Sequence, residues 1–244
     1  MAFIYLKKHE TMRNLLRPFE DFLCLFFPHL CLACERNSPP YDEHICTSCK
    51  VTLPETDFHL RKENPFTEKF WGRVNLEAGT AMYLFTKESR VQNLIHNLKY
   101  RRKENVGTTL GRRLGYTLKQ SPLFADVDII VPVPLHIRKL RIRGYNQSEV
   151  FGNGISETFG RPCLGNGMKR IVHSASQTKQ SRESRLHNVG EVFEVAKPKS
   201  LEGKHILLVD DVLTTGATLE TCANKLLEIP GTRVSMATIA IAMH

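Results

Sequence analysis

Residues 205–218, HILLVDDVLTTGAT, are the segment whose residue types and spacing are best suited to chemistry. Its mostly apolar first part predicts a buried strand that ends at Val209. Two adjacent carboxylates, Asp210 and Asp211, come next, and the turn Thr214–Thr218 then opens a helix-like pattern over Leu219–Leu227. Such a turn presents backbone N–H groups at a helix N-terminus, where the helix dipole favours a phosphate group.

The side chains of this segment complement the rest of a ribose 5-phosphate. Three threonine hydroxyls add donors for the phosphate, and Gly216 permits a backbone conformation or a close approach that a side chain would block. The two carboxylates are acceptors suited to the vicinal hydroxyls of a ribose. The alternative is an ordinary helix start capped by aspartate. The predicted ribose 5-phosphate site comprises Asp210, Asp211, Thr214, Thr215, Gly216, Ala217 and Thr218, with the two aspartates as candidate catalytic residues.

Basic residues gather in a second segment, residues 131–149, which follows another expected strand. The carboxyl end of a parallel strand is where a pyrophosphate would lie. The formal net charge is +9, and residues 99–103 add a further basic cluster. Clusters of this kind suit phosphate-rich partners, although they also occur as solvated faces. The candidate ligands for pyrophosphate or another polyanion are Lys99, Arg138, Lys139, Arg141 and Arg143, with magnesium bridging the remaining phosphate oxygens.

A third segment, residues 177–188, supplies a candidate rim for this site. Arg182 and Arg185 are three residues apart and would share one face of a helix. A solvated helix is the alternative interpretation.

Four of the seven cysteines form two CxxC pairs, Cys31 with Cys34 and Cys46 with Cys49. Four thiolates at this spacing can surround one tetrahedral ion, most typically zinc, and a closed set of four sulfurs predicts a structural site. His29 and His44 lie nearby and are interpreted as surface residues. The pattern does not suit a disulfide framework and indicates a reducing, cytoplasmic setting. No apolar run is long enough to span a membrane, and no export signal is evident.

The order of apolar patterns predicts the fold. Strand-like segments at 76–85, 128–134, 192–195, 205–209 and 234–242 are separated by helix-like segments at 91–98, 106–118, 148–159 and 219–227. This alternation predicts an α/β fold with a parallel sheet flanked by helices. We expect this domain to span residues 75–244. A small zinc-binding module is expected over residues 12–60, including an amphipathic helix from Leu15 to Phe26 whose apolar stripe packs on the main domain, a partner or a membrane surface.

The run of strand, twin aspartate and threonine loop resembles the signature of the type I phosphoribosyltransferases. Four segments occur in the order seen in the ComF family: NLIHNLKY ending at Tyr100, VPVPLH with RGYNQS over 131–148, QTKQSR ending at Arg182, and VDDVLTTGAT ending at Thr218. The likeness covers the chain from about Leu15 and includes the cysteine module.

The ComF resemblance implies a type I phosphoribosyltransferase fold that binds phosphoribosyl pyrophosphate (PRPP) at Asp210, Asp211 and Thr214–Thr218. It further implies a part in natural competence, with incoming single-stranded DNA and other competence proteins as partners. Family members are often labelled amidophosphoribosyltransferases, but nothing before Leu76 could supply the glutaminase domain of those enzymes. Two functions follow as hypotheses. The first is a PRPP-binding protein that handles single-stranded DNA, and the second is an active phosphoribosyltransferase that transfers the phosphoribosyl group to a nitrogen nucleophile.

Overall fold

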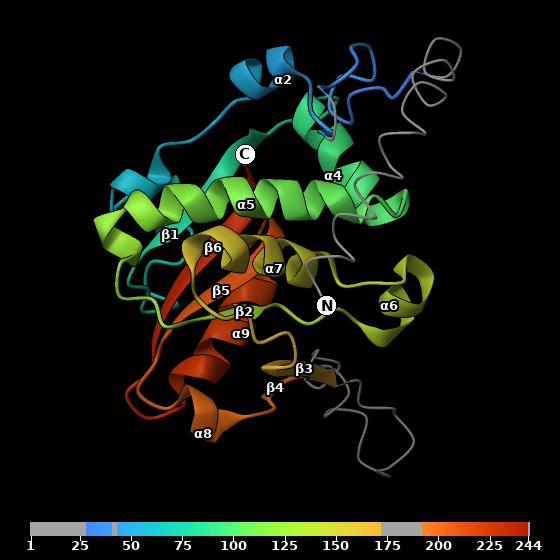
Figure 1. Ribbon diagram of the computed structural model, residues 1–244. Helices are drawn as coiled ribbons and strands as arrows, with labels where there is room; N and C mark the ends of the chain where they lie inside the picture. Colours follow the sequence, from blue (N-terminus) through green and yellow to red (C-terminus); the bar gives the residue numbers. More distant parts are fainter. Residues whose placement is uncertain (1–27, 41–42, 172–191, 244) are drawn as a thin grey trace, which may run out of the picture. The chain divides into compact units, whose positions relative to one another are not determined.

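The computed structural model describes residues 28–40, 43–171 and 192–243, drawn in colour in Figure 1. The chain divides into two compact units after Thr52. This division falls earlier than the expected end of the cysteine module at residue 60. The difference has a local cause, because residues 53–60 bond to the second unit: the Thr56 N–H donates to the Met82 carbonyl over 2.9 Å. The amphipathic helix expected at Leu15–Phe26 lies outside the described residues.

The second unit is built on a four-stranded sheet in which every neighbouring pair is parallel. Both central strands are almost continuously buried, as expected for a parallel sheet covered on both faces. The order of strands across the sheet is β1 (Gly79–Phe85), β6 (Arg233–Ala242), β5 (His205–Leu213) and β2 (Ile129–Pro132).

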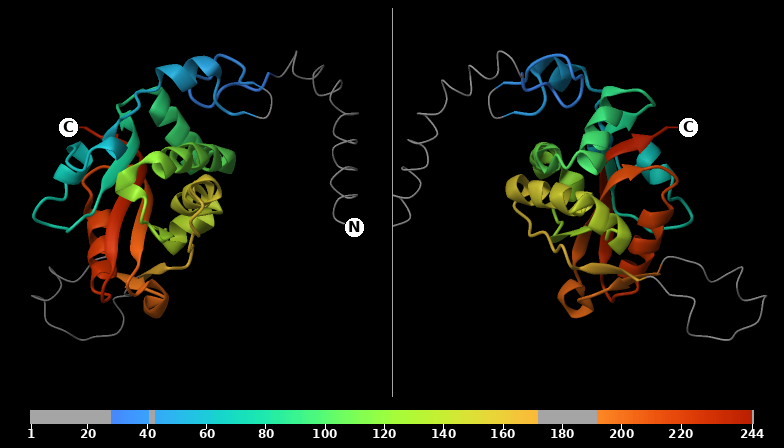
Figure 2. Two further views of the ribbon diagram at one scale, coloured as in Figure 1. Left: turned by 60° about the vertical axis from the view of Figure 1, so that its left-hand side comes forward. Right: turned by 90° about the vertical axis from the view of Figure 1, so that its right-hand side faces the viewer.

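Helices cover both faces of this sheet (Figures 1 and 2). The helices α5 (Glu104–Gln120) and α7 (Gln147–Phe159) pack together on one face, and α9 (Ala217–Leu227) lies on the other. The close approach of α5 to α7 depends on glycine. A Cβ atom on Gly111 would lie 2.3 Å from the Phe151 carbonyl oxygen and 2.9 Å from the Cα atom of Gly154. The backbones of the two helices are therefore in direct contact.

The remaining elements are short. In the first unit, α2 covers Thr47–Thr52. In the second, α4 (Arg90–Tyr100) precedes α5, and a two-stranded antiparallel ribbon joins β3 (Met168–Ile171) to β4 (Val192–Val195). The others are η1 (Phe58–Leu60), α3 (Pro65–Glu68), η2 (Pro122–Phe124), α6 (Ile137–Arg143) and α8 (Pro198–Leu201). Among the described residues, no helix is both long and apolar enough to cross a membrane.

The predicted α/β fold, a parallel sheet flanked by helices, is confirmed. One boundary that matters for the site was wrong. The strand expected to end at Val209 continues as β5 to Leu213, because β6 extends far enough to pair with it: Asp210 lies opposite Thr238 and Leu213 opposite Ile241. The twin carboxylates therefore sit within a strand, and only residues 214–216 form the turn.

Candidate functional site

The side chain of Asp210 is held in place by hydrogen bonds in the C-terminal half of β5. Its Oδ1 atom accepts from the Ser148 hydroxyl over 2.7 Å and from the Asp211 backbone N–H over 2.8 Å. Ser148 lies in the first turn of α7, whose N-terminus is capped by the Asn146 side chain. Burial of the Asp210 carboxyl and the neighbouring charge of Asp211 raise its pKa to about 7, against the lowering effect of the Ser148 hydrogen bond.

Asp211 carries an ion pair. Its Oδ1 atom lies 2.8 Å from the Nζ atom of Lys99, which projects from the last turn of α4. Both side chains are largely buried, at 21% exposed for Lys99 and 13% for Asp211. Lys99 was predicted from its basic cluster to face a polyanion, and the structure brings it directly to the twin carboxylates.

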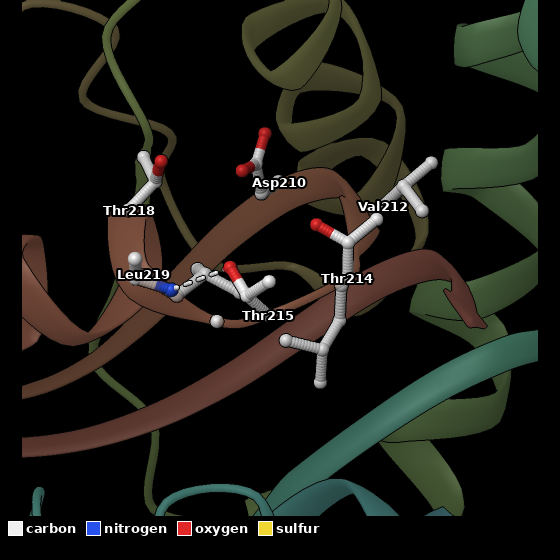
Figure 3. Close-up of a pocket in the computed structure, with 9 residues that line it drawn as sticks. Asp210, Val212, Thr214, Thr215, Thr218 and Leu219 are labelled. Atoms are coloured by element: carbon white, nitrogen blue, oxygen red, sulfur yellow. Dashed lines mark hydrogen bonds between the residues drawn. The ribbon is translucent and has the colours of Figure 1, made fainter. Parts of the chain in front are cut away.

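The turn after β5 forms a pocket lined by Asp210 and residues 212–219. Figure 3 shows the side chains of Asp210, Thr214, Thr215 and Thr218 arranged around the same hollow. Gly216 is the N-cap of α9 and has a left-handed backbone with φ of 85°. This conformation turns the chain sharply into the first turn of α9. Backbone N–H groups at such a helix start can bind an anion. All the residues predicted for the ribose 5-phosphate site except Asp211 line this pocket.

An adjoining pocket shares Asp210 and Thr218 with the first and contains about 510 Å³ of empty space, including its open mouth. Its lining includes Asp211 and three of the five cations predicted to bind a polyanion, which are Lys99, Lys139 and Arg143. Arg138 and Arg141 do not line it. The helical periodicity of α6 explains the division, because residues 139 and 143 are four apart and share a face. None of the residues of α6 is buried.

The sequence did not predict Arg170 in this second pocket, and it placed the segment 131–149 there without singling out Asn146, Gln147 and Ser148. Arg170 enters it from β3, a strand that was not predicted, and Asn146, Gln147 and Ser148 enter it from the start of α7. Burial lowers the pKa of the Arg170 guanidinium. The capping sequence Asn146 before a helix was a readable signal for the second group. Nothing in the local pattern around Arg170 distinguished it from a solvated lysine or arginine.

The raised pKa of Asp210 predicts a pH dependence of stability. The Asp210 carboxyl stays protonated in the folded chain up to about pH 7, whereas an aspartate of an unfolded chain ionises near pH 4. The folded state therefore binds more protons in between, and this group's contribution to stability decreases as pH rises from about 4 to about 7. We expect the free energy of unfolding of the unmodified protein, measured in urea, to fall by about 2 kcal/mol from pH 5 to pH 8 through this group. Asp210→Asn lacks the titrating carboxyl and should not show this decrease.

Asp57→Asn provides the matched control for this measurement. The side-chain hydrogen bond from Arg61 lowers the pKa of the exposed Asp57 carboxyl, so that group is already ionised throughout the range. The control should follow the pH profile of the unmodified protein. A parallel profile for Asp210→Asn as well would contradict the raised pKa.

In the first unit, the four predicted cysteines come together. The Sγ atoms of Cys31, Cys34, Cys46 and Cys49 all lie within 4.8 Å of one another. Four sulfurs bound to one ion at about 2.3 Å would stand roughly 3.8 Å apart, so the group fits a single tetrahedral metal ion. The cluster found among the described residues contains cysteines alone, without His29 or His44.

Backbone donors surround this cluster in the manner of metal-binding knuckles. The Cys31 Sγ atom accepts from the N–H groups of Ala33 over 3.4 Å and Cys46 over 3.3 Å. Burial acts to raise the pKa of Cys34, but backbone hydrogen bonds from Asn37 and Arg36 lower it to about 6. Such donors stabilise thiolates, which are the form that binds metal.

The predicted rim residues Arg182 and Arg185 lie outside the described residues.

Comparison with known proteins adds a domain and a set of relatives. A family model described as "Phosphoribosyl transferase domain" matches residues 145–244, which include α7, β5, α9 and β6. Competence protein F of Haemophilus influenzae is 33% identical over 138 residues, or 54% of this chain and 60% of that protein. DNA utilization protein YhgH of Salmonella typhi is 31% identical over 137 residues, or 55% of this chain and 60% of that protein. Competence protein ComFC of Bacillus subtilis is 32% identical over 100 residues, or 41% of this chain and 38% of that protein.

The chain therefore spans about three fifths, or less, of the length of the curated relatives that it matches. The domain matched by the family model, residues 145–244, contains both carboxylates and the turn of the pocket. These similarities confirm the resemblance to the ComF family that the motifs predicted, and they place a phosphoribosyl transferase domain at residues 145–244 of this chain.

Proposed function

We propose that this chain binds PRPP and acts in natural competence by handling incoming single-stranded DNA. One observation carries the first part: an anion-binding helix start and a cation-lined pocket adjoin one another and share Asp210 and Thr218. PRPP has the matching form, with a 5-phosphate at one end of the ribose and a pyrophosphate at the other. The names of the relatives, competence proteins F and ComFC and DNA utilization protein YhgH, support the second part.

Each part of the ligand has a proposed partner. Thr214–Thr218 would hold the 5-phosphate through hydroxyls and helix N–H groups. Asp210 and Asp211 would accept from the two ribose hydroxyls, and Lys99, Lys139, Arg143 and Arg170 would face the pyrophosphate. Magnesium fits this donor set because it prefers phosphate oxygens, water and a few carboxylates. It would neutralise part of the pyrophosphate charge next to Asp211.

A surface beside the second pocket suits single-stranded nucleic acid. Tyr100 is 64% exposed, and the Arg143 guanidinium lies over its ring, 5.3 Å from the ring centroid. Exposed cations at residues 101–103 follow it directly. Aromatic rings among cations bind single strands by stacking and by charge. Arg143 is common to this surface and to the pyrophosphate pocket, so the two ligands would compete for it.

We also infer that the ion held by the four cysteines is zinc. A set of four thiolates with a tetrahedral spacing favours zinc over the harder cations, and its closed coordination makes the site structural. Thiols of this kind remain reduced in the cytoplasm, which is where we propose that the protein acts.

Calorimetric titration of the full chain with PRPP tests the first part of this function. We expect binding that requires magnesium and that weakens about tenfold in Asp211→Asn, because the ribose loses a charged acceptor. Asp128→Asn, at the opposite end of the sheet, is the control and should bind PRPP normally. Equal affinity of Asp211→Asn and the unmodified protein would exclude this assignment of the pocket.

The same titration tests the second part when it is repeated in the presence of a single-stranded oligonucleotide. We expect the oligonucleotide to bind in a salt-dependent manner and to weaken PRPP binding through their shared Arg143. Absence of oligonucleotide binding at low salt would remove the proposed role in DNA handling while leaving the PRPP site intact.

Phosphoribosyl transfer is the second candidate function, and the cations of the second pocket are the observation that favours it. They would stabilise a departing pyrophosphate while a nitrogen nucleophile attacks the ribose. Pyrophosphate release from PRPP, assayed with a panel of amines, bases and single-stranded DNA, distinguishes turnover from binding alone.

A further inference from the structure

The ion pair between Lys99 and Asp211 occupies the site that the proposed function assigns to a ribose. Both residues line the second pocket, with 2.8 Å between Nζ and Oδ1. Asp210 differs from its neighbour, because the donors that bond to its Oδ1 atom are a hydroxyl and a backbone N–H, which carry no formal charge. One of the two carboxylates is thus neutralised by a cation of the protein itself.

Contacts on either side of Lys99 fix its backbone at the pocket. The carbonyl of Leu98 accepts a hydrogen bond from the Tyr145 hydroxyl, and the ring of Tyr100 packs under the Arg143 guanidinium. Arg143 also donates to the Gln147 Oε1 atom over 2.7 Å. The end of α4 is therefore attached to the segment between α6 and α7, whereas the lysine side chain has four rotatable methylene groups and can change partner.

The two simplest candidate ligands differ in what they offer Lys99. Ribose 5-phosphate brings neutral hydroxyls to Asp211, and a hydroxyl is a weaker partner for a partly buried carboxylate than an ammonium group is. Its phosphate belongs at the turn before α9, in the other pocket. PRPP brings a pyrophosphate into the second pocket as well, so the ammonium can exchange one anion for another without being left unpaired.

We propose that Lys99 determines specificity for ribose phosphates that carry a second anionic group. In the free chain its ammonium group neutralises Asp211 and disfavours ligands without a pyrophosphate. When a pyrophosphate is present, Lys99 binds it and leaves Asp211 to the ribose. This inference rests on the proposed PRPP-binding function and adds a mechanism of selection to it.

The test compares the affinities of PRPP and ribose 5-phosphate, both with magnesium, for the unmodified chain and Lys99→Met. Methionine keeps the length and apolar stem of the side chain and removes its charge. We expect ribose 5-phosphate to bind roughly threefold more tightly and PRPP roughly tenfold more weakly, so that the preference for PRPP falls about 30-fold. Lys99→Gln, a second neutral variant, should change both affinities in the same directions.

Lys139→Met is the matched control, since Lys139 also lines the pocket but projects from α6. It should weaken PRPP binding without improving that of ribose 5-phosphate. Equal weakening of both ligands by Lys99→Met and Lys99→Gln would show a merely structural role and overturn the inference. If the unmodified chain binds neither ligand, the proposed function itself fails, and the specificity role fails with it.

Discussion

Removal of the zinc ion that we propose for the cysteine cluster is expected to unfold the module formed by residues 28–52. Few apolar side chains are available to hold so short a segment, and the ion would replace a hydrophobic core. Structural zinc contributes on the order of 10 kcal/mol in small isolated domains. We expect one zinc ion per chain by elemental analysis, and chelation should abolish hydrogen-exchange protection in α2 while that of β5 and β6 persists.

Cysteine variants provide the comparison for this experiment. Cys49→Ser should lose the metal ion, because serine does not supply a thiolate. Cys163→Ser changes a cysteine outside the cluster and should retain the ion, as should His44→Ala. Retention of zinc by Cys49→Ser, or full protection of α2 after chelation, would contradict a structural metal site made of four sulfurs.

Gly216→Ala is expected to abolish most PRPP binding. The left-handed backbone at Gly216, with φ of 85°, is strained for any residue with a Cβ atom, and that atom would lie 3.0 Å from the Phe70 ring. The turn would relax and redirect the N–H groups that face the phosphate. Because each hydrogen bond to a charged group contributes about 1.5–3 kcal/mol, calorimetry should show a loss of roughly 100-fold in affinity.

Gly160→Ala is the control that distinguishes the general effect of backbone strain from the effect of strain at the phosphate-binding turn. Gly160 has a similar φ of 79° at the end of α7, and a Cβ atom there would have no neighbour within 4 Å. Both variants should lower the free energy of unfolding by about 1–2 kcal/mol, but only Gly216→Ala should impair binding. Loss of PRPP binding in Gly160→Ala would mean that general destabilisation, and not the turn, explains the result.

Periodicity was sufficient to predict the layers of the fold and the edge where the site lies. The apolar runs that became β5 and β6 and the three- and four-residue spacings in α4, α5 and α9 are strong, local signals. Since parallel strands end at the same edge, the segments after β2 and β5 had to meet there. The neighbourhood of Asp210 and the basic segment could be inferred for this reason.

The remaining features depend on partners that are distant in the sequence. Aspartate disfavours strands, so the continuation of β5 through Asp210 and Asp211 could be known only from its pairing with β6. The contact of Lys99 with Asp211 depends on how α4 docks, and Arg170 depends on the ribbon formed with β4. Helix α6 was not predicted either, because its three apolar residues alternate with four cations and none of its residues is buried.

The continuation of β5 also determines how the two halves of the pocket respond to a ligand. Asp210 and Asp211 are carried by a central strand with neighbours on both sides, so their positions are preorganised before binding. Lys139 and Arg143 are carried by α6, which has no buried residue, and Lys99 acts through a long side chain. Recognition of the sugar should therefore be stereochemically strict, whereas the anionic substituent is held by adaptable charges that tolerate differences in its length and shape.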